Sequence, residues 1–345
     1  MNACPNVRHL LVLPHLRVQN ANAVSSPLTH GFPAITAFMG LMCALERKAR
    51  SNGLDVHFEA VGVVCHGHQE MVNDGYVKTL RLTRNPVDKD GGTAAIVEEG
   101  RIHLEISLVL AARSATWRDE PEQANDDASR LAELLATMRV AGGTLLPPAS
   151  LRMQHRHRPH VVHLTGNEDQ QQAAFFKLRR HLLPGFALVA RDDLLEQRWA
   201  DLRAENPGVS QLEAWLSLVR AEWLYQAGDA NADAGEPEDA KNKTKGEWVK
   251  PPRAGWIVPI PVGYGALGEL HAPGTVANAR DAHTPSRFVE SLYSVGQWLS
   301  PHRLHMPEQL LWYADSQPDA GLYRCRNDYA ALHEVADADF DFDFN

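Results

Sequence analysis

The sequence predicts an α+β fold that begins with a ferredoxin-like unit. Apolar residues occupy every second position from Ile102 to Leu110, the clearest strand pattern in the chain. The residues before this strand read as a strand, a helix, a strand and an excursion, and a helical pattern follows it at about 125–140. This order suits the split β-α-β arrangement of ferredoxin-like folds.

A polar stretch separates the first predicted strand from the first predicted helix. Residues 7–13 are mainly apolar and predict a buried strand, whereas residues 17–33 are mostly small, amide or hydroxyl side chains and predict a loop. Pro33 suits the first turn of a helix that runs to about Arg50, with its apolar residues on one face and Gly53 after its end.

Two further segments lead into the strand at 101–110. Residues 55–66 predict a second strand, in which Gly62 is a candidate for a bulge. The stretch 83–100 contains one proline and two adjacent glycines, so we expect it to leave the sheet as an excursion or hairpin. Residues 1–115 would then form one core.

The region 116–226 is predicted to be mainly a helical insertion. Within it, residues 152–163 combine arginines with histidines in a loop-like setting. Ser210 and Glu213 have the spacing of a capping box and therefore predict the start of a helix. Residues 185–190 suit a short strand.

The C-terminal part divides into three predicted segments. Residues 227–250 are poor in apolar side chains and predict a flexible loop. Residues 251–330 are expected to complete the body of the protein. Residues 331–345 alternate acidic residues with phenylalanine and predict a mobile acidic tail.

Two elements are expected within 251–330. A strand-like run starts near Trp256, and its prolines favour a sheet edge or a strand end. Thr284 and Pro285 suit the start of a helix whose apolar residues recur at helical spacing as far as Leu299.

The formal net charge of −9 at first argues against nucleic-acid binding, which depends on Lys and Arg. Nine acidic residues, however, lie in two segments that contain no Lys or Arg, and the remaining chain is neutral without them. They are Asp229, Asp233, Glu236, Glu238, Asp239, Asp337, Asp339, Asp341 and Asp343. A neutral body with local basic strips can bind RNA beside partner proteins.

The sequence also indicates the compartment. It contains no run of about 18 apolar residues, and its N-terminus lacks the layout of a signal peptide, so we expect a cytoplasmic protein without membrane contact. The four cysteines are scattered without a C-x-x-C pair, which predicts reduced thiols and no structural zinc.

No motif predicts an enzyme. The chain has no G-x-S-x-G, H-E-x-x-H, phosphate-binding loop or dinucleotide-binding loop, so we expect no cofactor and no catalysis through any of these motifs. The strip at 152–163 lacks accompanying cysteines and carboxylates, and its arginines would repel a cation. A basic loop that faces RNA or solvent is therefore preferred there to a metal site.

Several segments carry a resemblance to a known family. The run Q-N-A-N-A-V-S-S-P-L-T-H-G-F-P at 19–33 resembles the signature of one subunit of type I-F CRISPR surveillance complexes, known as Cascade or Csy complexes. The runs R-V-A-G-G-T-L-L-P, L-L-P-G-F-A-L-V, G-W-I-V-P-I-P-V-G-Y-G-A-L and W-L-S-P-H-R resemble it in the same order. The chain thus resembles, over nearly its full length, the second Csy subunit, a Cas-five-type RAMP protein.

This resemblance implies a ferredoxin-like, RNA-recognition-motif-like RAMP core with a thumb, which would fall at about 83–100. It implies a non-catalytic role in antiviral defence, with binding to the 5′ handle of the CRISPR RNA. It also implies three partners: the large Csy subunit, the repeated backbone Csy subunit and, through the complex, target double-stranded DNA.

We assign RNA binding to amide side chains of the polar stretch at 17–33 and to basic or amide side chains elsewhere. An amide offers a donor and an acceptor, and therefore suits either a base edge or a turn. The aromatic signature of ordinary RNA-recognition motifs is absent, so we expect contact through loops and the thumb. The candidates are Arg17, Gln19, Asn20, Asn22, Arg84, Asn85, Lys89, Arg101, Arg280 and Arg287.

Two alternatives remain open from the sequence. The chain could be a metal-independent CRISPR RNA endoribonuclease that uses a histidine such as His66 with a neighbouring hydroxyl. It could also be a protein-binding adaptor that makes no RNA contact.

Overall fold

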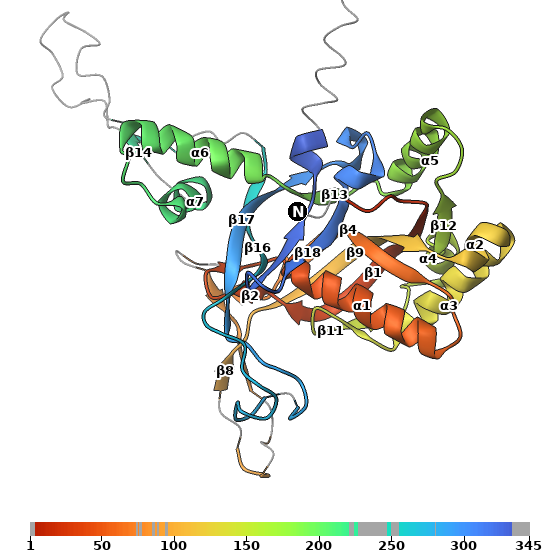
Figure 1. Ribbon diagram of the computed structural model, residues 1–345, viewed down its shortest axis with the longest axis horizontal. Helices are drawn as coiled ribbons and strands as arrows, with labels where there is room; N and C mark the ends of the chain where they lie inside the picture. Colours follow the sequence, from red (N-terminus) through yellow and green to blue (C-terminus); the bar gives the residue numbers. More distant parts are fainter. Residues whose placement is uncertain are drawn as a thin grey trace, which may run out of the picture.

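The computed structural model describes residues 4–332, apart from 74, 76–77, 85–86, 88–89, 94–95, 221–223, 227–246, 250–254 and 280. It shows an α+β protein built around one large antiparallel sheet (Figure 1). Eleven of the described strands form this sheet. Ten of them follow the order β10 (Arg139–Val140), β11 (Gly143–Leu146), β1 (His9–Asn22), β9 (Arg101–Arg113), β4 (His57–Glu70), β13 (Phe186–Ala190), β17 (Val289–Leu299), β16 (Ile257–Ala266), β19 (Leu322–Arg326) and β18 (Leu311–Gln317).

Two further pairings complete the sheet. β12 (His160–His163) pairs with the first half of β1, on the edge that β11 occupies further along the strand. β18 pairs with β4 as well as with β19, so the path from β4 through β13 to β18 closes on itself. The N-terminal and C-terminal halves of the chain therefore share one hydrogen-bonded sheet.

The strand predicted at 101–110 is confirmed as part of β9, at the centre of this arrangement. It lies between β1 and β4 and runs antiparallel to both. Ile102, Leu104 and Ile106 are all buried and belong to the core on one face of the sheet. The period-two pattern therefore marks which side of β9 faces that core.

Two helices cover this first face. They are α1 (Ile35–Ser51) and α3 (Ala124–Ala136), and both contribute buried side chains to the core there. The predicted apolar face of α1 is confirmed, because each of its members is buried. These are Ile35, Phe38, Met39, Met42 and Leu45.

The second face of the sheet is covered over only part of its length. Phe175 and Leu178 of α5 (Glu168–His181) pack with Leu10 and Val12 of β1 in a separate core. Leu310, in the C-terminal part of the chain, joins this core. The other half of β1, towards Asn22, extends beyond α5.

The remaining described elements are short or peripheral. The helical ones are α2 (Ala115–Asp119), α4 (Leu151–Arg156), α6 (Asp192–Glu205), α7 (Gln211–Val219), η1 (Pro121–Gln123), η2 (Pro301–Arg303) and η3 (Pro307–Gln309). The paired strands outside the large sheet are β2 (Val24–Ser26) with β3 (Thr29–His30), β5 (Val72–Asn73) with β6 (Thr79–Leu80), β7 (Leu82–Arg84) with β8 (Ile96–Glu98), and β14 (Leu224–Gln226) with β15 (Glu247–Val249).

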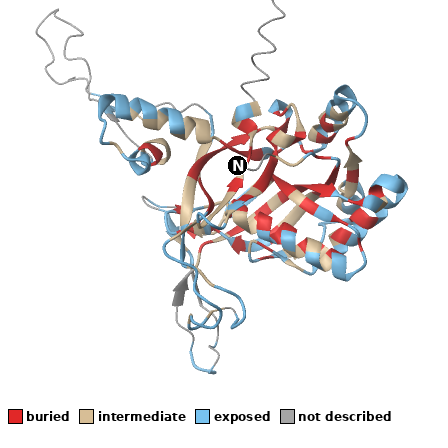
Figure 2. Ribbon diagram, in the orientation of Figure 1, coloured by how far each residue is buried: buried red, intermediate tan, exposed pale blue. Residues whose placement is uncertain are grey.

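The helices α6 and α7 lie to one side of the body (Figure 1). No residue of α6 is buried, and Figure 2 shows its surface as exposed or intermediate. The predicted capping box of Ser210 and Glu213 is present at the start of α7. The buried Trp215 fixes α7 to the sheet, because its Nε1 donates to the backbone oxygen of Ser294 at 2.9 Å.

The region 116–226 supplies more than helices. Its strands β10, β11, β12 and β13 all join the large sheet. The short strand predicted at 185–190 is confirmed as β13. Most of the predicted loop at 227–250 and of the predicted tail at 331–345 lies outside the described residues.

The loop predicted at 17–33 is wrong. β1 continues to Asn22, and β2 and β3 follow it. Buried small residues, Ala21 and Ala23, interrupt the polar side chains, and the partner strands satisfy the backbone of β1. A polar segment at the end of a strand therefore read as a loop when its partners were unknown.

The helix predicted from Thr284 is also wrong, because the segment forms β17. Val295, Trp298 and Leu299 are buried although they do not all lie on one side of the strand. A strand buried on both faces has no period of two and cannot be separated from a helix by periodicity. The loop-like strip at 152–163 likewise proves to hold α4 and β12.

The prediction for the prolines of β16 is confirmed. β17 pairs with β16 over its whole length, but β19 pairs only with Gly263 to Gly265. Pro259 and Pro261 therefore lie where β16 has a single partner.

The bulge expected at Gly62 is not there, since the irregularities of β4 fall between Phe58 and Ala60 and between Cys65 and Gly67.

Gly143 lets the β10–β11 hairpin approach β1 closely. A Cβ atom at this position would lie 2.7 Å from the backbone nitrogen of Ala21 and 2.8 Å from the backbone oxygen of Gln19. We expect Gly143→Ala to lower the free energy of unfolding by about 1–3 kcal/mol, because backbone atoms cannot yield to a methyl group. Urea denaturation would measure this loss.

Gly268→Ala is the matched control, since its Cβ atom would meet nothing within 4 Å. It should change stability by less than about 0.5 kcal/mol. Equal stabilities for the two variants would contradict the close approach at Gly143.

His9, at the start of β1, makes stability depend on pH. Its side chain is buried, and its Nδ1 lies 2.9 Å from Nδ1 of His163. Burial, followed by the neighbouring His163, lowers the pKa of His9 to about 4. The unfolded chain, with a pKa near 6.5, then binds the proton more strongly than the folded chain does.

The stability associated with neutral His9 is therefore complete above about pH 6.5 and is lost as the pH falls towards 4. We expect His9→Gln to flatten the loss of unfolding free energy over this range, measured by urea denaturation at successive pH values. His181→Gln, at an exposed histidine, should keep the slope of the original protein. Parallel profiles for His9→Gln and the original protein would contradict the assignment.

Candidate nucleic-acid interface

The second face of the central strands is partly exposed beyond α5. On β9, the residues that alternate with the buried Ile102, Leu104 and Ile106 point to this face. On β1, Leu16 and Val18 pack into the helix-covered core, so Arg17 and Gln19 point the opposite way. We call this surface the open face, defined by His15, Arg17, Gln19, His103 and Glu105.

Two of the predicted RNA-binding residues at this surface have solvent-exposed amide side chains. Gln19 and Asn20 are exposed, and neither side chain hydrogen-bonds to any described residue. Asn20 adopts a left-handed backbone with φ of 56°, at the bulge between Val18 and Ala21. Its backbone nitrogen donates to Nδ1 of His103 at 3.1 Å, which fixes this bulge against β9.

Asn22 holds a turn. Its Nδ2 donates to the backbone oxygen of Val24 at 2.8 Å, and its Oδ1 accepts from the backbone nitrogen of Val24 at 3.0 Å. Both ends of the amide are therefore used inside the chain. Of the two roles that the sequence left open for this residue, the structure shows the turn.

The predicted arginines are distributed over different parts of the surface. Arg17 is half-buried, and its Nη1 donates to the backbone oxygen of Pro147 at 3.3 Å. Arg101 lies opposite Asn22 in the sheet and pairs with Glu99. Arg287 lies apart from the open face, where its Nη1 donates to the backbone oxygen of Pro318 at 3.2 Å.

Four candidates cannot be placed as side chains. Arg84 belongs to β7, but its side chain lies outside the described part of the structure, as do residues Asn85, Lys89 and Arg280.

Three histidines lie together at the end of the open face that contains His15. The rings of His15 and His66 stack with centroids 4.0 Å apart, and His157 lies against His15 at 3.8 Å. Nδ1 of His15 lies 2.7 Å from Oε1 of Glu105. Four segments distant in sequence therefore meet here, which no local pattern indicates.

His66 also contacts a hydroxyl group, as the endoribonuclease alternative requires. Its Nδ1 lies 2.7 Å from the carbonyl oxygen of Pro184, so this nitrogen carries the proton. Nε2 then accepts from Oγ of Ser107 at 2.6 Å. Burial lowers the pKa of His66, which favours this neutral form. Ser107, however, is 0% exposed, so its hydroxyl is closed to a substrate.

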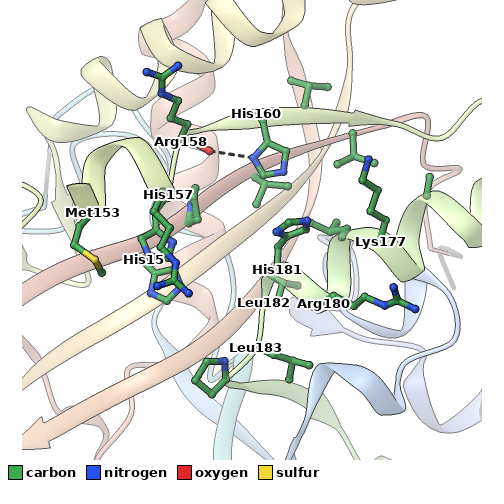
Figure 3. Close-up of a pocket in the computed structure, with 18 residues that line it drawn as sticks. His15, Met153, His157, Arg158, His160, Lys177, Arg180, His181, Leu182 and Leu183 are labelled. Atoms are coloured by element: carbon green, nitrogen blue, oxygen red, sulfur yellow. Dashed lines mark hydrogen bonds between the residues drawn. The ribbon is translucent and has the colours of Figure 1, made fainter. Parts of the chain in front are cut away.

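A basic pocket of about 860 Å³ adjoins these histidines (Figure 3). Residues of α4, β12, α5 and β1 line it, and none of the lining residues is acidic. Its cationic side chains are Arg156, Arg158, Lys177 and Arg180. The sequence indicated the strip that contains the first two, but not the two on α5, because that segment was predicted only as part of a helical insertion.

An aromatic cleft of about 400 Å³ lies on the other side of His66. Phe186 and Trp256 are 44% and 48% exposed at this cleft, with their rings 5.4 Å apart in an edge-to-face arrangement. Phe32 and Trp298 lie beside them, with centroids 4.8 Å apart. These rings come from four separate segments, so the sequence showed no aromatic signature.

Among the residues that the structure describes, no group of three or more His, Cys, Asp or Glu side chains is arranged to hold a metal ion. Within the same part of the chain, no helix is both long and apolar enough to cross a membrane.

Comparison with known proteins identifies the family. A family model described as CRISPR-associated protein (Cas_Csy2) matches residues 11–325. The chain belongs to the Csy2 family. It is 43% identical over 330 residues to the CRISPR-associated protein Csy2 of Pseudomonas aeruginosa (strain UCBPP-PA14). The matched region covers 95% of this chain and 98% of that relative. The resemblance predicted from the sequence motifs is therefore confirmed.

Four of the motifs that carry this family resemblance meet at the aromatic cleft. The T-H-G-F-P end of the first motif supplies Phe32, and L-L-P-G-F-A-L-V supplies Phe186. G-W-I-V-P-I-P supplies Trp256, and W-L-S-P-H-R supplies Trp298. The cleft is thus built from segments that carry the resemblance to the Csy2 family.

Proposed function

We propose that this Csy2-family chain is a non-catalytic subunit of a type I-F CRISPR surveillance complex and that it binds the 5′ handle of the CRISPR RNA. Family membership supports the CRISPR role. One structural observation carries the RNA contact: Gln19 and Asn20 present exposed amides that have no hydrogen-bond partner among the described residues. Such groups can read base edges without breaking an internal hydrogen bond.

The strand order supports a ferredoxin-like RAMP core. The elements β1, α1, β4, β9, α3 and β12 follow the β-α-β-β-α-β order, with β10 and β11 inserted before β12. In space the four strands lie in the order β12, β1, β9, β4, and every neighbouring pair is antiparallel. The last strand of this core would therefore come from residues 160–163, beyond the segment 1–115.

A thumb role is proposed for the β7–β8 hairpin. It falls between β4 and β9 in sequence, as the excursion predicted at 83–100 does, and its strands pair antiparallel. Figure 1 shows β8 projecting away from the body. An arm of this shape can reach along an RNA or to a neighbouring subunit.

Partner binding forms part of the proposal. We assign to the chain contacts with the large Csy subunit, with the backbone Csy subunit and, through the complex, with target double-stranded DNA. Exposed apolar side chains outside the open face support protein contacts, since such groups are common at interfaces. Tyr225 is 56% exposed and Trp248 is 61% exposed on the β14–β15 pair.

Co-expression tests the RNA role. The chain would be produced with the other Csy subunits and either a natural CRISPR RNA or one with a scrambled 5′ handle. We expect RNA in the purified complex, shown by nucleic-acid absorbance and mass, and a clear preference for the natural handle. A complex that contains this chain without RNA would instead support the adaptor alternative.

Two variants locate the contact on the open face. We expect Gln19→Ala and Asn20→Gly each to weaken binding of handle RNA by about 1 kcal/mol, roughly fivefold, through loss of a hydrogen bond. Glycine is chosen for Asn20 because it adopts the left-handed backbone without strain. Equal losses for natural and scrambled handles would contradict base reading at these residues.

The proposal that the chain is non-catalytic has its own test. Although His66 and Ser107 form an imidazole–hydroxyl pair, the serine is fully buried, which supports a structural role. Purified chain incubated with CRISPR repeat RNA, with and without chelator, is expected to leave the RNA intact on a denaturing gel. Cleavage products that disappear in His66→Ala would establish the endoribonuclease alternative.

A further inference from the structure

We propose that the basic pocket between α4, β12, α5 and β1 binds the sugar–phosphate backbone of single-stranded RNA. The inference deepens the proposed function and rests on it, because it extends the RNA path from the open face into a second site. No predicted RNA-binding residue lies in this pocket.

The charge of the pocket is positive and uncompensated. Arg156, Lys177 and Arg180 are exposed, and none of them pairs with a carboxylate among the described residues. Elsewhere in the structure arginines do pair, as Arg324 does with Asp192 at 2.7 Å. Among the described residues, the carboxylate that contacts the lining of the pocket is Glu105, whose Oε1 lies 2.7 Å from Nδ1 of His15. A protein with a net charge of −9 thus keeps a group of free cations in one place.

The walls of the pocket strengthen this field. Val12, Val161, Leu178 and Leu182 line it between the cations and are buried. Apolar walls lower the local dielectric and concentrate the field of the charges around them. An anion in the pocket is therefore attracted more strongly than it would be on a flat surface.

Internal contacts fix several of the polar groups. Nη2 of Arg158 donates to Nδ1 of His155 at 2.7 Å, and Nδ1 of His160 donates to the backbone oxygen of Arg158 at 3.0 Å. Lys177 and Arg180 lie one turn apart on α5, which begins with a complete capping box of Asn167 and Gln170. Arg156 of α4 and Lys177 and Arg180 of α5 thus line one pocket. Figure 3 shows the two side chains of α5 on one side of it.

The size and position of the pocket favour a polynucleotide. A volume of about 860 Å³ exceeds the space that one phosphate requires and suits a ligand of nucleotide size or larger. His15 lines the pocket and also belongs to the open face. Gln19 lies four residues further along β1, roughly 13 Å at the usual rise of a strand. An RNA strand held at Gln19 can therefore continue past Arg17 into the pocket.

The histidines contribute ring faces to this path. His157 lies against His15, and burial, with smaller effects of His15 and Arg156, lowers its pKa. A neutral imidazole offers a planar surface on which a base can stack, while the arginines and the lysine contact phosphates. An acidic peptide would use only the positive charges, whereas RNA would use both the charges and the ring faces. The combination therefore suits RNA better.

The test compares two matched double variants of the full chain. Lys177→Ala/Arg180→Ala removes two charges from α5, and Arg47→Ala/Arg50→Ala removes two at the same spacing from α1, which covers the other face of the sheet. Fluorescence anisotropy with a labelled oligoribonucleotide from the 5′ end of the CRISPR RNA would give affinities over a range of salt concentrations. Lys177→Arg/Arg180→Lys is the conservative variant, and denaturation midpoints would verify folding.

We expect the α5 double variant to lose affinity for the natural and the scrambled handle by the same factor, because phosphate contacts carry no sequence information. The slope of log affinity against log salt should fall by about 0.7 for each lost phosphate contact. The conservative variant and the α1 variant should keep the original slope.

Three results would overturn the proposal. The first is an unchanged slope for the α5 variant, which leaves the proposed function intact if Gln19→Ala still reduces handle preference. The second is a wild-type chain that binds neither the natural nor the scrambled RNA. In that case the co-expression experiment still tests the proposed function separately. The third is loss of a Csy subunit from the co-expressed complex without any change in the RNA affinity of the chain, which would assign the pocket to an acidic protein partner.

Discussion

The pairing of β9 with β1 and β4 is the constraint on which the rest of this structure depends. Because side chains alternate across a strand, these three strands place one row of residues against α1 and α3 and the other row on the second face. Where α5 covers that second face, the row is apolar, as at Leu10 and Val12. Where it does not, the row carries Arg17 and Gln19. The surface proposed to bind RNA is thus the part of the sheet that the core leaves uncovered.

Departures from regular strand geometry shape this surface. The bulge at Asn20 turns an amide outwards at the end of β1, and Gly143 lets the β10–β11 hairpin lie against the neighbouring backbone. Asn22 uses both ends of its amide to fix the turn into β2. Amides that look alike in the sequence therefore divide into one that holds the chain and two that remain open to a ligand.

Local pairing of charges, and not the net charge of the chain, determines where positive charge remains at the surface. Arg326 and Asp315 lie 2.6 Å apart, and Arg191 bonds to Asp193 at 2.8 Å, so many charges neutralise one another within the fold. Arg156 and Lys177 have no such partner among the described residues. The average charge of the chain consequently says little about where an anion would bind, and the positions of the unpaired cations say more.

The residues alone were sufficient for the family, the α+β class, the alternating strand at 101–110 and the apolar face of α1, because each depends on local pattern or on long motifs. They were not sufficient for β17, whose burial on both faces removes its periodicity, or for the end of β1, whose polar residues resemble a loop until β9 and β11 pair with it. Gln19 and Asn20 were found as candidates, whereas Lys177, Arg180 and the cleft rings Phe186 and Trp256 were not. These side chains are distant in sequence and become neighbours only when the sheet and α5 bring them together, since no local pattern encodes a contact between remote segments.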